Sequence, residues 1–183
     1  IEIIHHGIRT ATNGDVRLNP TPEQWDSIPQ LIKKQIKKES NSIEVFLKYP
    51  SYDFEYSIQA EPKDNGISLR VNLSKPLPVN LEGVAGLNLE FLPAAYFHKS
   101  YSMDGRLETI PLYPSSDMMK EHTATEPLPL ATGKTLVLAP EDDSRRIKIQ
   151  SNEELKFYDG RNKAQNGWYV VRTLIPAKKT GKV

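Results

Sequence analysis

The chain of 183 residues contains no cysteine, which excludes disulfide bonds and any cysteine nucleophile or metal ligand. It has no apolar run approaching the roughly 20 residues that a membrane-spanning helix needs, so no membrane span is predicted. Lys and Arg (24) nearly balance Asp and Glu (23), and the formal net charge of +1 argues against a nucleic-acid partner. The ten glycines are scattered, so no glycine-rich phosphate loop is predicted.

Motifs for catalysis or metal binding are also lacking. Acid–base catalysis needs carboxylates in contrasting environments, and the available candidates form no such pair: Glu82, Glu90, Asp104, Glu108 and Asp159. We interpret Glu90 as an exposed strand carboxylate, and Asp104 and Asp159, each followed by glycine, as turn residues. The acidic run at residues 141–143 lacks the spaced ligands of a calcium loop. We therefore predict no catalytic residue, no metal site and no cofactor.

Alternating apolar residues are the main structural signal of the chain. Fourteen prolines separate short segments of this kind, a pattern that favours many strands over a few long helices. Asn13-Gly14 is a typical hairpin signal. The segments with strand-like alternation or β-branched character lie at residues 43–47, 54–58, 67–73, 87–91, 136–138, 147–149, 155–158 and 168–175. The sequence predicts an all-β fold, an antiparallel, supersandwich-like β-sandwich of eight or nine strands that forms one domain over residues 1–183.

One short amphipathic helix is predicted near residues 29–38. Pro29 suits a first helical turn, and Asp26 or Ser27 suits the cap before it. Leu31, Ile32, Gln35 and Ile36 form a narrow stripe, and four lysines occupy the other faces. We interpret the lysines as a solvated face.

The densest apolar and aromatic stretch runs from residue 86 to residue 105. Leu87, Leu89 and Phe91 alternate with polar residues, and Pro93 ends the predicted strand because it has no N–H to donate. Residues 109–129 then carry four prolines and many polar residues, so we predict a long excursion loop. Loops of this length are often functional or face a partner.

Exposed aromatic residues are the best candidates for binding a ligand. Tyr101 and Tyr113 flank the predicted loop, and Trp168 opens the last predicted strand. Flat aromatic rings stack on the apolar faces of sugar rings, so these three residues form a candidate carbohydrate-binding set. The alternative is that each ring belongs to the protein core.

Three segments together carry a resemblance to a known family: YPSYDFEY (residues 49–56), GVAGLNLEFLPAAYFHKSY (83–101) and RNKAQNGWYVVRTLIP (161–176). Residues 43–176 resemble the N-terminal β-sandwich region of large bacterial glycoside hydrolases of family nine from gut Bacteroidetes. The resemblance implies a periplasmic or extracellular accessory domain, which packs against a helical catalytic domain located downstream. The catalytic carboxylates of such enzymes have no matching positions in these 183 residues.

We therefore expect an excised N-terminal module, since the chain starts at Ile1 and stops at Val183 in an unfinished pattern. Its expected function is to support the downstream catalytic domain of a secreted glycoside hydrolase. An autonomous carbohydrate-binding module, with a polysaccharide as partner, is the alternative. A small enzyme in its own right is a third possibility, which requires a carboxylate pair about 5 to 9.5 Å apart.

Overall fold

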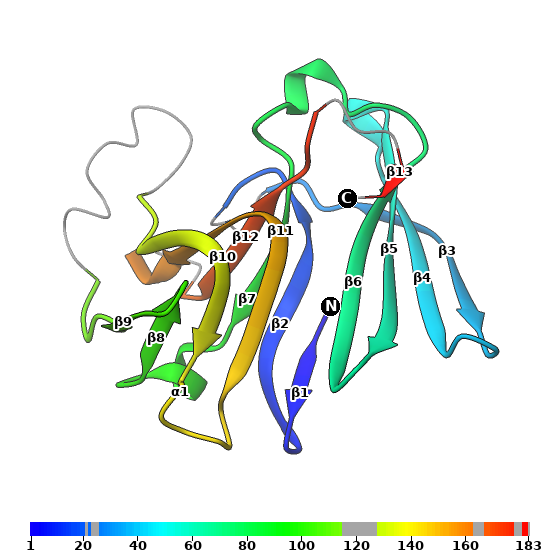
Figure 1. Cartoon of the computed structure of the whole chain (residues 1–183). Coiled ribbons are helices and arrows are strands. Elements are labelled where there is room, and N and C mark those ends of the chain that lie inside the picture. The colour runs from blue at the N-terminus through cyan, green and yellow to red at the C-terminus, as the bar shows by residue number, and fades with distance from the viewer. Residues whose placement is uncertain (21, 23–25, 115–127, 163–166, 178–180, 183) are drawn as a thin grey trace. The chain divides into compact units, whose positions relative to one another are not determined.

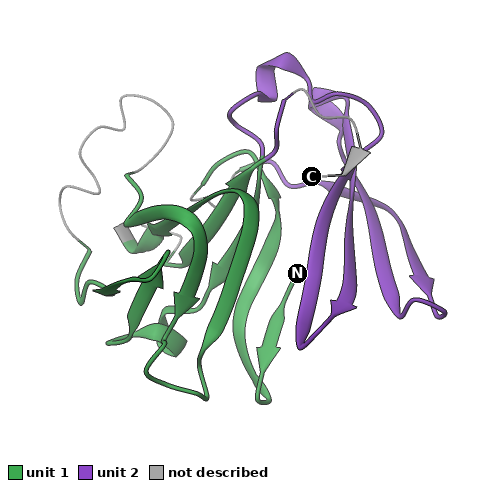
Figure 2. Ribbon diagram, viewed as in Figure 1, with its two compact units in different colours: residues 1–26, 86–174 green, residues 27–85, 175–183 purple. Residues whose placement is uncertain are grey.

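The computed structural model describes residues 1–20, 22, 26–114, 128–162, 167–177 and 181–182. The chain forms two compact units, coloured green and purple in Figure 2. Unit 1 comprises residues 1–26 and 86–174, and unit 2 comprises residues 27–85 and 175–183. Most of unit 2 is therefore inserted, in sequence, between the two parts of unit 1.

Unit 1 contains an eight-stranded antiparallel sheet in the order β1-β2-β7-β12-β11-β10-β8-β9 (Figure 1). Its strands are β1 (Ile3–His5), β2 (Ile8–Arg17), β7 (Gly86–Phe91), β8 (Ser100–Met103), β9 (Arg106–Thr109), β10 (Ala131–Leu138), β11 (Ile147–Asp159) and β12 (Tyr169–Leu174). Short helical turns follow two of them, α1 (Pro93–Tyr96) after β7 and η4 (Gly160–Asn162) after β11.

The centre of this sheet is buried on both faces. Phe91 pairs with Tyr169 across β7 and β12, and Phe157 on β11 lies on the same face, with its ring centroid 6.2 Å from that of Tyr169. Tyr158 and Val170 pair on the opposite face and are also buried. The predicted strands at residues 87–91 and 168–175 are thus confirmed, and they lie side by side.

The hairpin near the N-terminus lies at a different position from the predicted one. The hairpin between β1 and β2 is made by His6 and Gly7, which adopt φ values of +48° and +76°. The hairpin predicted at Asn13-Gly14 is wrong, because both residues lie inside β2, where its pairing with β7 is irregular. Asn13 has a φ of +51°, a left-handed conformation that suits a bulge as well as a turn.

Unit 2 contains a five-stranded antiparallel sheet in the order β13-β6-β5-β4-β3. Its strands are β3 (Gln30–Lys37), β4 (Ser42–Tyr49), β5 (Phe54–Lys63), β6 (Gly66–Leu73) and β13 (Gly181–Lys182), with 3-10 turns η1 (Pro50–Tyr52) and η2 (Val79–Leu81). Consecutive hairpins connect β3 to β6. The rings of Tyr49, Phe54 and Tyr56 stack in the buried part of this unit, with centroids 5.0–6.3 Å apart.

The helix predicted near residues 29–38 is wrong, because residues 30–37 form the edge strand β3. Leu31 pairs with Leu47 and Ile36 pairs with Ile43, so both lie on one face of the sheet although five residues separate them. A register shift between Leu31 and Lys33 makes this possible. The bulge adds one residue to a period of two, and the resulting spacing imitates a helical stripe.

The predicted fold class is confirmed as all-β, with antiparallel pairing in both sheets. Helical structure among the described residues is limited to short turns such as α1 (Pro93–Tyr96). Within the described part of the chain, no helix has the length and apolar character needed to cross a membrane.

Candidate functional site

Tyr101, the first residue of the candidate carbohydrate-binding set, lies inside unit 1. Its side chain on β8 is buried, and its ring packs edge-on against Phe157 with a centroid distance of 5.0 Å. The hydroxyl donates a hydrogen bond to the carbonyl of Leu130 at 3.4 Å, and burial raises the pKa of Tyr101 above its usual value. This ring therefore faces protein atoms, and its role in the structure is to anchor the segment that enters β10.

Tyr113 and Trp168 have more accessible rings. Tyr113 is 77% exposed, and Trp168 is half-buried directly before β12. Residues 115–127, most of the predicted excursion loop, lie outside the described residues. The structure therefore separates the candidate set into one buried ring and two rings that reach the surface.

An arginine holds the segment that presents Tyr113. Arg161 donates hydrogen bonds from Nη2 to the carbonyl of Pro111 at 2.6 Å and from Nη1 to the carbonyl of Leu112 at 3.1 Å. The same guanidinium contacts both carboxylate oxygens of Asp159 at 2.6–3.2 Å and lies over the ring of Tyr169, 4.9 Å from its centroid. We call these side chains and carbonyls the Arg161 clamp.

The Arg161 clamp is well shielded from water. The side chain of Asp159 is fully buried, and 13% of the Arg161 side chain is exposed. The hydrogen bonds that Arg161 donates to Asp159 raise the pKa of Arg161, and burial raises the pKa of Tyr169 to about 12. The planar guanidinium of Arg161, which is always charged, thus donates hydrogen bonds to two backbone carbonyls and one carboxylate. These bonds fix the position of residues 111 and 112.

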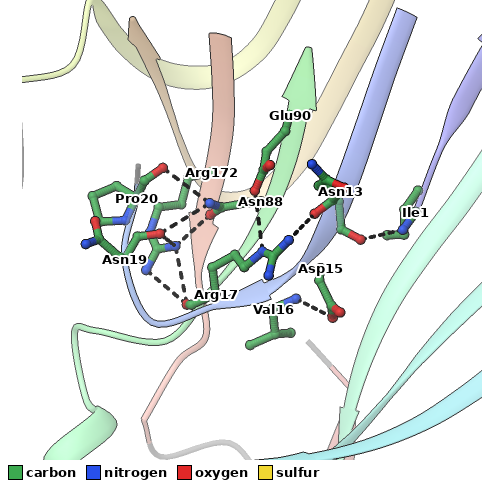
Figure 3. A network of polar contacts seen from close by, with 11 residues as sticks. Ile1, Asn13, Asp15, Val16, Arg17, Asn19, Pro20, Asn88, Glu90 and Arg172 are labelled. Carbon is green, nitrogen blue, oxygen red and sulfur yellow. Dashed lines mark hydrogen bonds and ion pairs between the residues drawn. The ribbon is translucent and has the colours of Figure 1, made fainter. Parts of the chain in front are cut away.

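A second group of charged residues crosses the sheet of unit 1 (Figure 3). Arg172 on β12 donates from Nη1 to Oδ1 of Asn88 on β7 at 2.6 Å, and it also reaches the carbonyls of Arg17 and Asn19. Asn88 in turn donates to the carbonyls of Asn19 and Pro20 at 3.2–3.3 Å. We call Arg17, Asn88, Glu90 and Arg172 the sheet polar network.

Glu90 is the titratable carboxyl of this network. Its side chain is 1% exposed, and Oε1 lies 3.4 Å from Nε of Arg17. Burial raises the pKa of Glu90 to about 7, and the positive charge of Arg17 opposes that rise. The interpretation of Glu90 as an exposed strand carboxylate is therefore wrong, because both faces of β7 are covered at this point.

Two other carboxylates serve the backbone. Asp104 has a φ of +51° and forms a turn with Gly105, as the sequence predicts, while its oxygens accept hydrogen bonds from the N–H groups of Lys134 and Thr135 at 2.8–3.1 Å. Asp159 belongs to the Arg161 clamp. The hydrogen-bond partners of Asp104 and Asp159 explain the positions of these two carboxylates without a catalytic role.

The acidic run at residues 141–143 is occupied by protein partners. Asp142 contacts Nζ of Lys99 at 2.7 Å and accepts two hydrogen bonds from Ser144, and these contacts lower the pKa of Asp142 to about 2. Glu141 accepts a hydrogen bond from the N–H of Ser100. No group of three or more potential metal ligands occurs among the residues that the structure describes.

Several exposed apolar side chains of unit 2 share one face of its sheet. Leu31, Ile36, Ile43 and Ile67 are 66%, 63%, 39% and 73% exposed, and we call them the exposed apolar end of the sheet. Strand pairing places them on the same face as the buried Leu47, Tyr56 and Leu73. On the inner strands this face is therefore buried near Tyr49, and it is open to solvent at the other end of the strands and at Leu31 on the edge strand β3. Contiguous exposed apolar surface is typical of an interaction site.

Comparisons with known proteins give no match. No protein-family model, no curated protein sequence and no solved structure is similar to this chain at a significant level.

Sequence reasoning missed the two arginines and the edge strand. Arg161 follows Asp159 by two residues after a turn glycine, a local spacing that points to a side-chain pair. Arg172 lies in an otherwise apolar strand, and a charge in such a strand requires a buried partner. No sequence pattern predicts the exposed apolar end, because alternation of apolar residues does not indicate how much of a sheet face is covered by other parts of the protein.

Proposed function

We propose that this chain is a non-catalytic accessory domain of a secreted bacterial glycoside hydrolase, resembling family nine. In this proposal it packs against a downstream catalytic domain of the same polypeptide and supports it. The observation that carries the proposal is the exposed apolar end of unit 2, where Leu31, Ile36, Ile43 and Ile67 share one open sheet face. Covering such a surface is favourable by about 25 cal/mol per Å² of apolar area buried.

The chemistry of the described carboxylates supports a non-catalytic role. Glu90 lies beside Arg17 inside the sheet, Asp159 is held by Arg161, and Asp104 accepts hydrogen bonds from the backbone. A glycosidase needs an acid and a second carboxylate that face a common cleft. In this part of unit 1 the carboxylates instead hold strands and loops together.

The test uses the full-length polypeptide that contains these residues. Ile36→Asp and Ile43→Asp together are expected to lower the melting temperature of the catalytic domain by several degrees and to reduce hydrolysis of its polysaccharide. Ile4→Asp, at an isoleucine on β1 that is 67% exposed, is the matched control and is expected to change neither the melting temperature nor the hydrolysis. A parent chain without a catalytic domain, or equal effects of the two sets of variants, would contradict the proposal.

Carbohydrate binding is the second candidate, and one observation favours it. Tyr113 is 77% exposed, yet its neighbour Leu112 is fixed by the Arg161 clamp, so the ring is presented from an anchored segment. A preorganised aromatic ring binds with a smaller loss of conformational entropy than a ring on a free loop.

Affinity electrophoresis and calorimetry with soluble plant polysaccharides test this second candidate. Tyr113→Ala and Trp168→Ala are expected to weaken binding at least about tenfold, with the fold unchanged. Tyr101→Phe is the control, since its buried ring would keep its packing. The absence of binding to every polysaccharide would leave the accessory-domain proposal standing alone.

A further inference from the structure

Among the residues that the structure describes, the edge strand β3 has a pairing partner on one side only. All eight of its residues are exposed, and its pairing within the sheet is to β4 on one side (Figure 1). Backbone N–H and C=O groups on the other side are therefore available to another extended segment. Native proteins generally shorten, bend or cover such edges, because they add strands readily.

The side chains of β3 combine apolar and cationic character. Leu31 and Ile36 lie on the apolar face, and Ile32 lies at the bulge and is 46% exposed. Ile28, just before the strand, is 69% exposed. Four large apolar side chains thus lie along this edge. An edge strand that is only protected against aggregation is expected to carry fewer exposed apolar side chains.

Lysines give this edge a single sign of charge. The strand carries Lys33, Lys34 and Lys37 and no acidic residue. Lys33 lies over the ring of Phe46 at 4.3 Å, and Lys37 lies 3.4 Å from Glu44 on β4. These contacts hold Lys33 and Lys37 over β4, on the sheet face opposite Leu31 and Ile36, whereas Lys34 pairs with Val45 on the apolar face. A strand added beside β3 would therefore meet two lysines on one face and mainly apolar side chains on the other.

We propose that β3 binds an extended peptide segment in which apolar and acidic residues alternate, and that this segment adds a strand to the sheet of unit 2. Backbone pairing supplies affinity, and the alternating side chains supply specificity. Apolar residues of the partner contact Leu31 and Ile36, while its carboxylates face Lys33 and Lys37. A second copy of β3 is disfavoured, because it places lysines opposite lysines. The inference holds whether or not the chain belongs to a glycoside hydrolase.

Binding of labelled peptides to the whole chain tests the proposal. The probe is a fluorescent peptide of about eight residues with alternating Glu and Val, and its anisotropy is measured at low and at physiological salt. We expect saturable binding that weakens with salt. A peptide with Lys in place of Glu is expected to bind at least about tenfold more weakly. A Glu-Val peptide with alternate amides N-methylated loses its ladder donors and is expected not to bind.

Charge reversal on the protein provides the matched comparison. The triple variant Lys33→Glu, Lys34→Glu, Lys37→Glu is expected to lose binding of the Glu-Val peptide and to gain binding of the Lys-Val peptide. The control Lys63→Glu, Lys134→Glu, Lys148→Glu makes the same change of net charge away from β3 and is expected to retain the wild-type preference. The proposal is overturned if the Glu-Val peptide does not bind, if the N-methylated peptide binds equally well, or if the two triple variants behave alike.

Discussion

At the scale of single residues, the sheet polar network explains how unit 1 tolerates charges in its interior. The side chains of Glu90 and Arg172 are both about 1% exposed, and burial of a charge without partners is strongly unfavourable. The two Nη atoms of Arg172 donate hydrogen bonds to Asn88 and to the backbone carbonyls of residues 17 and 19. Those carbonyls belong to the chain as it leaves β2, so the buried charges also fix that segment.

The first prediction concerns the pH dependence of stability through Glu90. Its pKa is about 7 in the folded chain and 4.5 in the unfolded chain, so the folded state binds the proton more tightly. The contribution of Glu90 to stability is therefore fully present below about pH 4.5 and is lost as the pH rises through 7. The loss amounts to about 3 kcal/mol at most.

Denaturant unfolding of wild type and Glu90→Gln between pH 4 and pH 8 checks this prediction. The free energy of unfolding of the wild type is expected to fall relative to that of the variant across this range. The comparison with Glu90→Gln removes the opposite effect of acidic groups whose pKa is lowered, such as Asp142. A constant difference between the two proteins would show that Glu90 does not titrate in this range.

The second prediction concerns Arg161. Arg161→Lys keeps the positive charge but loses the planar fork that serves Asp159, Pro111 and Leu112, and is expected to destabilise unit 1 by about 1–3 kcal/mol. Arg106→Lys is the control, because the exposed pair of Arg106 with Glu108 is expected to contribute little. Chemical denaturation measures both, and equal effects of the two substitutions would argue against the clamp.

At the scale of elements, patterns with one clear period were predictable and interrupted patterns were not. The strands at residues 67–73 and 87–91 follow from uninterrupted alternation, and they are β6 and β7. The strand β3 was mistaken for a helix because its bulge breaks the alternation between Leu31 and Lys33. A bulge depends on the partner strand, which a local pattern does not contain.

The candidate site was less predictable than the fold. The sequence places both Tyr101 and Tyr113 beside the predicted loop as the least core-like rings, and of these two Tyr113 is exposed whereas Tyr101 is buried. Tyr101 has the same chemical character in the sequence but packs against Phe157, a residue on β11 that lies far along the chain. The Arg161 clamp likewise joins residues 111–112 to residues 159–169. Such long-range contacts leave no periodic signal.

The third prediction concerns the junction of β8 and β10. A Cβ atom at Gly133 would lie 2.3 Å from Oδ2 of Asp104 and 2.7 Å from Cγ of Met103. Asp104 cannot move freely, since it holds the N–H groups of Lys134 and Thr135. Gly133→Ala is therefore expected to destabilise unit 1 by about 1–3 kcal/mol.

Gly66→Ala is the matched control for this substitution. The nearest atom to an added Cβ there is the carbonyl of Lys63 at 3.8 Å, an ordinary contact. Thermal unfolding of both variants measures the difference. A Gly133→Ala protein as stable as Gly66→Ala would mean that the turn at Asp104 relaxes without loss.

At the scale of the whole molecule, the fourth prediction concerns solubility. The formal net charge is +1 at pH 7 and the sequence pI is about 8.0, so charge repulsion between copies is weak near pH 8. Exposed apolar side chains in unit 2, including Ile36 and Ile67, then favour association. Light scattering of the isolated chain is expected to increase from pH 6 to pH 8.

Substitution of the exposed apolar end tests the origin of this association. Ile36→Lys with Ile67→Lys adds two charges and removes two apolar contacts, and is expected to suppress scattering at pH 8. Ile4→Lys with Ile8→Lys makes the same change on β1 and β2 of unit 1 and is expected to have a smaller effect. Scattering that is independent of pH in the wild type would contradict the prediction.

The insertion of unit 2 has a consequence for the order of folding. Arg17 pairs with Gly86 where β2 meets β7, so residues 18–85 form a loop that must close before these strands can join. Within that loop, β3 to β6 are linked by consecutive hairpins, whose contacts are local and form quickly. Early folding of these hairpins shortens the effective length of the loop and lowers the entropy lost on closing it. Folding of the inserted hairpins thus favours the pairing of β2 with β7, the strands that precede and follow them in the sequence.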